Sequence, residues 1–238
     1  MKVYVTTSDN YLSLIKIFQF LFNRFWGKDQ EVVVLGYKKP EFELEENFSF
    51  HSMGVSRHTP DEWSTDLKKY FESINDKHFI LFFEDNFVVR PVNHELLNEI
   101  KDCLNDSVGR FCINNSIERS RGYVGTTKHI GYLKNVPLLE CNQDSQYRIS
   151  GMPSIWQRKY FLDNIQEEWS PWKWEIHGSE LIKNDGFKIL GTAIEHVVYN
   201  TLSVRKGDLT NIDWRIVDDY SKSLDENIIN EMKELNIL

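Results

Sequence analysis

The chain has 238 residues, of which 41% are hydrophobic and 27% charged, and this mix excludes a disordered or fibrous protein. Its formal net charge of −8 argues against a surface that, as a whole, binds nucleic acid or anionic membrane. The three cysteines form no CxxC pair, so neither a zinc site nor a disulfide framework is expected. We expect reduced thiols in a cytoplasmic protein.

Strand and helix signals alternate along the first half of the chain. The expected strands are 2–7, 31–36, 48–53, 78–83 and about 110–113. The expected helices are 11–25, about 59–74 and 92–104. The most apolar of these segments, 11–25, is interrupted by charged and amide residues, so no stable membrane insertion is expected.

The alternation loosens after about residue 122, where glycine, proline and aromatic residues dominate through 174. Strands are expected again at about 188–193 and 196–204, and a helix at about 225–235. Strands that alternate with helices imply an α/β fold with a mixed, mainly parallel sheet flanked by helices.

Two acids and an amide follow one of the strongest strands, in the run Phe82-Phe83-Glu84-Asp85-Asn86. Ligands of such sheets bind beyond the carboxyl ends of the strands. Neighbouring carboxylates crowd negative charge there, which a cation relieves, and hard oxygen ligands select Mg²⁺ or Mn²⁺. The alternative is a solvated turn.

The first strand also ends in polar residues, Thr6-Thr7-Ser8-Asp9-Asn10. Hydroxyl groups and backbone amides ahead of a helix suit a nucleotide or a phosphate. A helix N-cap role explains Ser8 or Asp9 equally well.

Aromatic residues gather between Trp156 and the segment 170–175, where Trp172 and Trp174 precede Glu175. Aromatic rings beside a carboxylate suit carbohydrate, because a sugar presents a flat apolar face and hydroxyl edges. Glu175 is then a candidate general base for an acceptor hydroxyl. A tryptophan-rich core is the alternative.

Two weaker signals follow the late strands. A neutral His196 can ligate a metal ion, and Arg205 and Lys206 can hold a diphosphate. A structural histidine is the alternative.

In the order of its motifs the chain resembles the small GT-A glycosyltransferases of bacteria and phages, over about residues 1–210. The motifs are Val-Thr-Thr-Ser-Asp, Val-Val-Val-Leu-Gly-Tyr, Trp63-Ser64, the Glu-Asp pair, Arg-Ile-Ser…Ile-Trp and Pro-Trp-Lys-Trp-Glu…Gly-Ser. The resemblance implies one GT-A (Rossmann-like) domain over 1–238, with a nucleotide-sugar-binding half (1–121), an acceptor-side half (122–210) and a C-terminal tail (211–238).

The resemblance also implies roles for individual residues. The nucleotide-sugar donor is expected to be held by Thr6, Thr7, Asp9, Trp63, Ser64, Asp66, Glu84 and Asp85. Lys206 is added to this set for its charge. The expected ligands of Mn²⁺ or Mg²⁺ are Asp85 and His196. The expected catalytic residues are Glu175 and Arg148. The substrate site is expected to be lined by Trp156, Trp172 and Trp174. The usual Asp-x-Asp motif is altered here, because Asn86 places a neutral amide at its third position.

The predicted activity is transfer of a sugar, by family default from a UDP-sugar, to a hydroxyl acceptor, with inversion and with Glu175 as base. The acceptor is a surface glycan or a modified base in phage DNA, for which Arg119, Arg121, Lys128 and Lys134 would line a groove. The alternatives are a non-catalytic carbohydrate-binding module and a nucleotidyltransferase. The first strand end has neither the glycine nor the basic residue common in nucleotidyltransferases.

Overall fold

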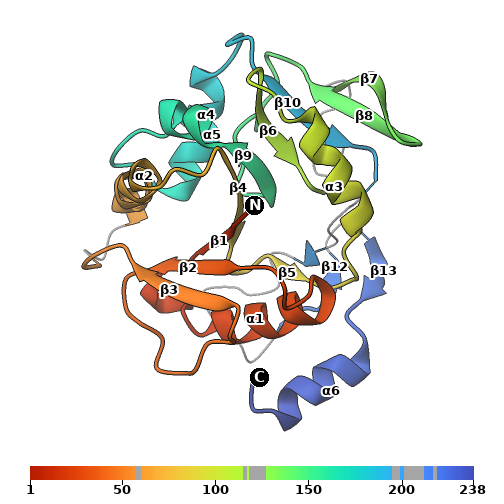
Figure 1. Cartoon of the computed structure of the whole chain (residues 1–238). Helices are drawn as coiled ribbons and strands as arrows, with labels where there is room; N and C mark the ends of the chain where they lie inside the picture. Colours follow the sequence, from red (N-terminus) through yellow and green to blue (C-terminus); the bar gives the residue numbers. More distant parts are fainter. Residues whose placement is uncertain (57–59, 115–116, 118–126, 195–198, 201–211, 217–218) are drawn as a thin grey trace. The chain divides into compact units, whose positions relative to one another are not determined.

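The computed structural model describes residues 1–56, 60–114, 117, 127–194, 199–200, 212–216 and 219–238. These residues form two compact units (Figure 1). The N-terminal unit consists of 2–52, 83–92 and 197–238, and the central unit of Met1, 53–82 and 93–196. Both units combine segments that are distant in sequence.

The N-terminal unit is built on three parallel strands in the order β3-β2-β1. Their bounds are β1 (Val3–Thr6), β2 (Val32–Gly36) and β3 (Phe48–Ser52). Every residue of β1 and β2 is buried. The continuous apolar runs therefore form strands that are covered on both faces, as the sequence indicated.

Helix α1 (Leu14–Phe25) packs against this sheet through its buried apolar face (Figure 1). Phe18 and Phe22 stack on each other, and both meet Phe48 of β3 edge to face. Burying each such side chain contributes about 1.5–3 kcal/mol. The polar interruptions of this helix fall on its other side, so the segment is an amphipathic helix of a globular core.

The rest of the N-terminal unit consists of short elements. They are η1 (Asp9–Tyr11), β5 (Phe87–Val88), β11 (Tyr199–Asn200), β12 (Arg215–Ile216), β13 (Asp219–Ser223) and α6 (Glu226–Glu234). Strand β11 pairs antiparallel with β5, and β12 pairs antiparallel with β13. Helix α6 starts at Asp225, whose carboxylate accepts a hydrogen bond from the backbone N–H of Asn227.

The central unit holds a mixed sheet in the order β4-β9-β6-β10-β8-β7. The strands are β4 (His78–Phe83), β6 (Val108–Cys112), β7 (Thr127–Leu133), β8 (Val136–Cys141), β9 (Ser154–Gln157) and β10 (Lys188–Thr192). Strand β9 lies antiparallel between β4 and β6, and β10 is parallel to β6. Strands β7 and β8 form an antiparallel hairpin that joins the sheet through β10.

In its described residues the central unit holds the α-helices α2 (Trp63–Ser73), α3 (His94–Cys103), α4 (Arg158–Asn164) and α5 (Pro171–Leu181), and the 3-10 helix η2 (Pro60–Glu62) precedes α2. An aromatic cluster holds α2, α4 and α5 against β4 and β9. The ring of Phe161 meets Phe71, Phe79, Trp156 and Trp174 at centroid distances of 5.1–5.6 Å. A Cβ at Gly109 would lie 2.4 Å from the Tyr160 ring, so glycine is what lets α4 approach β6.

The predicted mixed, mainly parallel α/β sheet flanked by helices is confirmed, and the strands and helices expected before residue 113 are present within a few residues. The sequence did not resolve β7, β8, β9, α4 and α5, which lie in the aromatic second half. In the described part of the chain no helix has both the length and the apolar character that crossing a bilayer requires.

Candidate functional site

Polar groups collect at the carboxyl ends of β1 and β2 in the N-terminal unit. Thr6 and Thr7 are almost fully buried, and the N–H of Thr7 donates to the carbonyl of Leu35 at 2.9 Å. The carboxylate of Asp9 accepts a hydrogen bond from the backbone N–H of Lys38 at 3.0 Å. Asp9 thus ties the loop after β1 to the loop after β2, and Ser8 makes no side-chain cap of η1.

The acidic run forms a tight turn immediately after β4 in the chain. The N–H of Asn86 donates to the carbonyl of Phe83 at 3.0 Å, and the Asn86 side-chain oxygen accepts from the Phe83 N–H at 3.4 Å. The amide nitrogen of Asn86 donates to Oδ1 of Asp85 at 3.2 Å. Asn86 is nearly buried and closes the turn, so its side chain orients Asp85 instead of offering its own oxygen to solvent.

The two carboxyl groups of this turn differ in their electrostatics. The pKa of Glu84 is raised well above its usual value, first because the group is desolvated and second because of the charge of Asp85. Glu84 therefore takes up a proton more readily than an ordinary glutamate.

Among the predicted donor residues, Trp63, Ser64 and Asp66 belong to the central unit, at the start of α2, and all three are buried. The Ser64 hydroxyl accepts from the N–H of Trp169 at 2.8 Å, and the Ser64 N–H donates to the Trp169 carbonyl at 3.2 Å. This pair fastens the start of α2 to the segment that leads into α5.

Glu175 lies in the second turn of α5 and is partly exposed. Its Oε1 accepts a hydrogen bond from the backbone N–H of Gly151 at 2.5 Å. The helix begins at Ser170, whose hydroxyl accepts from the N–H of Lys173 at 3.2 Å, with Pro171 at its first position. The cap and the Gly151 contact together fix the position of the Glu175 carboxylate.

The three tryptophans predicted as walls of a substrate site occupy different environments. Trp156 and Trp174 are 1% and 0% exposed, with ring centroids 5.3 Å apart, inside the aromatic cluster of the central unit. These two rings therefore form core, the alternative that the sequence left open. Trp172 is 66% exposed and presents its ring to solvent.

Arg148, predicted as catalytic, is fully buried in a network of structural partners. Its guanidinium pairs with Asp185 at 2.9 Å and donates to the carbonyls of Asn142 and Phe187. The hydroxyl of Tyr160 donates to the other oxygen of Asp185 at 2.9 Å. Burial, followed by the charge of Asp185, raises the pKa of Tyr160, so the phenol stays protonated.

Sequence reasoning missed a second buried arginine, Arg110 of β6. Its Nε donates to the Ser154 hydroxyl at 2.9 Å, and its guanidinium lies 5.3 Å from the Trp156 ring centroid. The sequence did carry a sign of this residue, because Arg110 is a charged residue within an otherwise apolar strand. Such an arginine can be buried when polar groups nearby accept its hydrogen bonds.

Two predicted residues, His196 and Lys206, lie outside the described residues. Within the described residues no group of three or more His, Cys, Asp or Glu side chains is arranged to hold a metal ion. Asp85 is thus a single candidate carboxylate, and further ligands would have to come from a bound diphosphate.

Comparison with known proteins gives structural likeness only. No protein-family model matches the sequence, and no curated protein matches it. The chain is similar to the galactosyltransferase LgtC in complex with donor and acceptor sugar analogs, at 15% identity and a TM-score of 0.45, over 80% of this chain and 73% of that one. It is also similar to a mannosyltransferase from Pyrobaculum calidifontis in complex with GDP-Man and Mn²⁺, at 14% identity and a TM-score of 0.45, over 82% and 53% of the two chains.

A further likeness is to a cytidylyltransferase from Leptospira borgpetersenii, at 11% identity and a TM-score of 0.43, over 99% of this chain and 94% of that one. These scores are similar for glycosyltransferases and for a nucleotidyltransferase. Because one fold hosts different functions, these likenesses do not choose between the two activities.

Proposed function

We propose that the chain is a glycosyltransferase that moves a sugar from a nucleoside-diphosphate donor, UDP-sugars being favoured, to a hydroxyl acceptor. The observation that carries the proposal is the acidic turn after β4, in which Asn86 holds the carboxylate of Asp85 and Glu84 has a raised pKa. A carboxylate oriented by a neighbouring amide is the usual arrangement of a metal-binding side chain.

The donor is assigned to residues of the N-terminal unit. Thr6 is the last residue of β1, and Thr7 and Asp9 follow it, at the edge where α/β sheets bind nucleotides. Among the residues of this unit, Asp85 would supply one carboxylate ligand for a divalent cation. Mn²⁺ or Mg²⁺ bound there would neutralise the charge that develops on the leaving diphosphate.

The acceptor is assigned to residues of the central unit. Glu175 would take the proton of the attacking hydroxyl as that oxygen forms its bond to the anomeric carbon and the bond to the diphosphate oxygen breaks. The hydrogen bond from Gly151 fixes one oxygen of Glu175. The exposed ring of Trp172 stands three residues before Glu175 on α5, and is the one of the three predicted tryptophans able to stack on a sugar face.

A glycan is favoured over DNA as the acceptor, because cations of the basic stretch are already paired. Lys128 lies 2.9 Å from Glu140, and Lys134 pairs with Glu95 and Glu99. These pairs reduce the positive charge available for a phosphate backbone. Arg119 and Arg121 lie outside the described residues.

The first test is a thermal-shift panel of uridine, guanosine, cytidine and thymidine diphosphates and their sugars, with and without Mn²⁺. A ligand at 100-fold excess over its dissociation constant stabilises by about 2.7 kcal/mol. A Mn²⁺-dependent shift with one nucleotide is expected, absent in Asp85→Ala and retained in Asp102→Ala, an exposed acid on α3.

The panel, extended to nucleoside triphosphates with a sugar phosphate and to an assay for released pyrophosphate, also separates the alternatives. No shift with any nucleotide would contradict the proposal and leave a carbohydrate-binding module. Binding of a free nucleoside triphosphate together with a sugar phosphate, with release of pyrophosphate, would instead identify a nucleotidyltransferase.

A further inference from the structure

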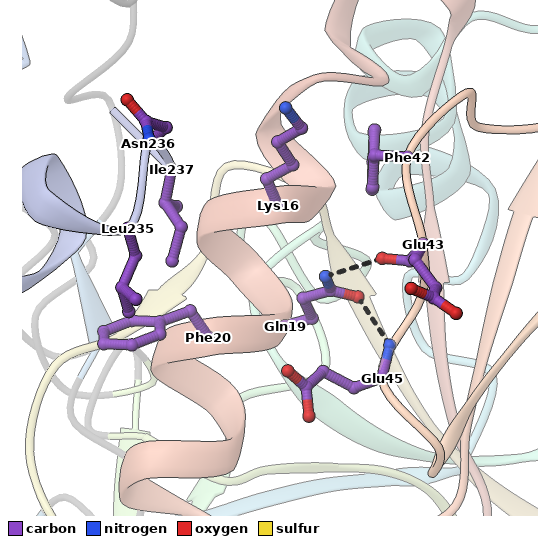
Figure 2. Close-up of a pocket in the computed structure, with 9 residues that line it drawn as sticks. All are labelled: Lys16, Gln19, Phe20, Phe42, Glu43, Glu45, Leu235, Asn236 and Ile237. Atoms are coloured by element: carbon purple, nitrogen blue, oxygen red, sulfur yellow. Dashed lines mark hydrogen bonds between the residues drawn. The ribbon is translucent and has the colours of Figure 1, made fainter.

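A pocket of about 310 Å³ opens on the N-terminal unit, lined by α1, residues 42–45 and residues 235–237 (Figure 2). Lys16, Gln19 and Phe20 of α1 form its floor, because their spacing places them on one face of the helix. None of the residues assigned above to the donor or acceptor lines this pocket. Its volume is at the lower end of the range of small-molecule sites.

The wall formed by residues 42–45 is held firmly to the floor. The side chain of Gln19, 9% exposed, donates to the carbonyl of Glu43 at 3.3 Å and accepts from the N–H of Glu45 at 3.2 Å. Nearby, the amide groups of Asn23 and Asn47 exchange two hydrogen bonds, at 2.9 and 3.1 Å. This wall therefore keeps its shape without a ligand.

The opposite wall is the turn that ends α6. The N–H of Ile237 donates to the carbonyl of Met232, and the N–H of Asn236 to that of Lys233, with φ of 51° at Asn236. This is the Schellman arrangement that closes a helix. Met232 is fully buried and anchors the helix, so the second wall is also preformed.

The chemistry of the pocket centres on Lys16. Its ammonium lies 5.3 Å from the ring centroid of Phe42, and in the described part of the chain it forms no ion pair. Figure 2 shows the ammonium directed away from the carboxylates of Glu43 and Glu45. The ammonium thus lies beside the Phe42 ring, in a pocket that Ile237 also lines, and it lacks a counter-ion in the described structure.

We propose that this pocket binds a small organic monoanion, with its carboxylate on Lys16 and an aromatic or branched apolar body against the Phe20, Phe42 and Ile237 side chains. With no competing counter-ion in the described structure, the Lys16 ammonium can form a charge-assisted hydrogen bond with a carboxylate. Glu45 is paired with Lys28 at 3.1 Å, so Glu43 is the lining carboxylate that disfavours a second negative charge, and a monoanion is preferred to a phosphate dianion.

Phenylacetate is the probe, titrated into the full-length protein and followed by isothermal calorimetry and saturation-transfer NMR. Neutral phenylacetamide and dianionic phenyl phosphate are expected to bind at least about tenfold more weakly, a difference of 1.4 kcal/mol. Lys16→Met keeps the apolar stem and removes the charge, and is expected to weaken phenylacetate binding to the same degree. Glu43→Gln is expected to strengthen it.

The matched control is Lys2→Met, which removes a lysine of the same unit that pairs with Glu31 and does not line the pocket. It should bind phenylacetate as the unaltered protein does. No binding of phenylacetate at millimolar concentration, or equal binding by Lys16→Met with unchanged circular dichroism, would overturn the proposal. This proposal and the proposed transferase activity can fail separately. Lys16 is not among the residues assigned to the donor, so Lys16→Met should keep the nucleotide-dependent thermal shift whether or not it binds phenylacetate.

Discussion

Asn86 donates its side-chain amide to Oδ1 of Asp85 at 3.2 Å, while its own oxygen accepts from the backbone of Phe83. The third residue of the acidic motif thus acts on the second. This relationship explains how a motif with an amide in place of a second aspartate still presents one ordered carboxylate.

Asn86→Ala is expected to weaken Mn²⁺ binding without removing a ligand. Loss of a hydrogen bond that orients a metal-binding carboxylate typically costs 10- to 100-fold in metal affinity. The concentration of Mn²⁺ that half-saturates nucleotide binding should therefore rise about tenfold, whereas Asp85→Ala should abolish the effect of Mn²⁺. Asn98→Ala, on the exposed side of α3, is the control. An unchanged Mn²⁺ requirement in Asn86→Ala would show that the turn holds Asp85 without this amide.

Glu175→Gln is expected to reduce kcat by about 100- to 10,000-fold, the usual contribution of a general base. The substitution keeps an oxygen that can accept from the Gly151 N–H, so the fold should be retained. Circular dichroism and kcat with saturating donor test this directly. Glu180→Gln removes another carboxylate of α5, one that pairs with Lys183 on the surface, and should keep full turnover. Full turnover in Glu175→Gln as well would mean that Glu175 only braces the 147–151 segment.

Trp172 and Trp174 are expected to respond differently to the same substitution. Trp174→Ala removes a fully buried ring and should lower the free energy of unfolding by about 3–5 kcal/mol. Trp172→Ala should change that free energy by about 0.5 kcal/mol or less, since the ring is largely exposed, while raising the acceptor KM about tenfold. Urea titration and acceptor saturation curves measure the two effects. A large loss of stability in Trp172→Ala would show that the ring packs in the folded protein.

The difference between these rings also marks the limit of what the sequence predicts. The elements before residue 113 were predictable because apolar runs and helical periodicity are local signals. The start of α5 carried a readable signal as well, a serine cap followed by Pro171, but the aromatic residues after it suggested a binding surface. Whether a tryptophan packs inside or faces solvent depends on tertiary contacts that the sequence does not state.

Strand β9 shows the same limit for topology. Its four residues are inserted antiparallel between β4 and β6, far from both in the chain. Neither length nor periodicity identifies so short a strand. For the site, the sequence predicted ligand-binding or catalytic roles for Glu84, Asp85 and Glu175, and these roles stay predictions. The role of Arg148 was implied by the family resemblance alone, and its pairing with Asp185 is a tertiary contact that no local pattern states.

The stability of the central unit is expected to fall as the pH drops below about 6.5, in part through His78 of β4. The pKa of His78 is lowered, first by burial and second by the charge of Lys77. The unfolded chain therefore takes up the proton at a higher pH than the folded one. The contribution of His78 is complete above its unfolded pKa and is lost as the pH falls through its folded pKa.

His78→Gln should flatten this part of the pH dependence, because glutamine does not titrate. Urea unfolding between pH 5 and 8 provides the measurement. His177→Gln, which changes an exposed histidine of α5, should keep the slope of the unaltered protein. Identical slopes for His78→Gln and the unaltered protein would assign the pH dependence to other groups.

Arg148→Met is expected to act on stability and not on the chemical step. The guanidinium is fully buried and pairs with Asp185. Its removal deprives the Asp185 carboxylate of its positive partner, while the neutral hydroxyl of Tyr160 still donates to it. Because Asp185 is partly exposed to solvent, the cost should fall below the value of about 3–5 kcal/mol that is typical of a fully buried pair. The double variant Arg148→Met/Asp185→Asn should lose less than the sum of the two single changes, because neither charge is then left alone. Urea unfolding of the four proteins gives the coupling energy, and kcat measured per folded molecule should stay close to that of the unaltered protein. If Arg148→Met instead kept its unfolding free energy and lost turnover, the guanidinium would have to reach the substrate, and the catalytic role expected from the family resemblance would hold.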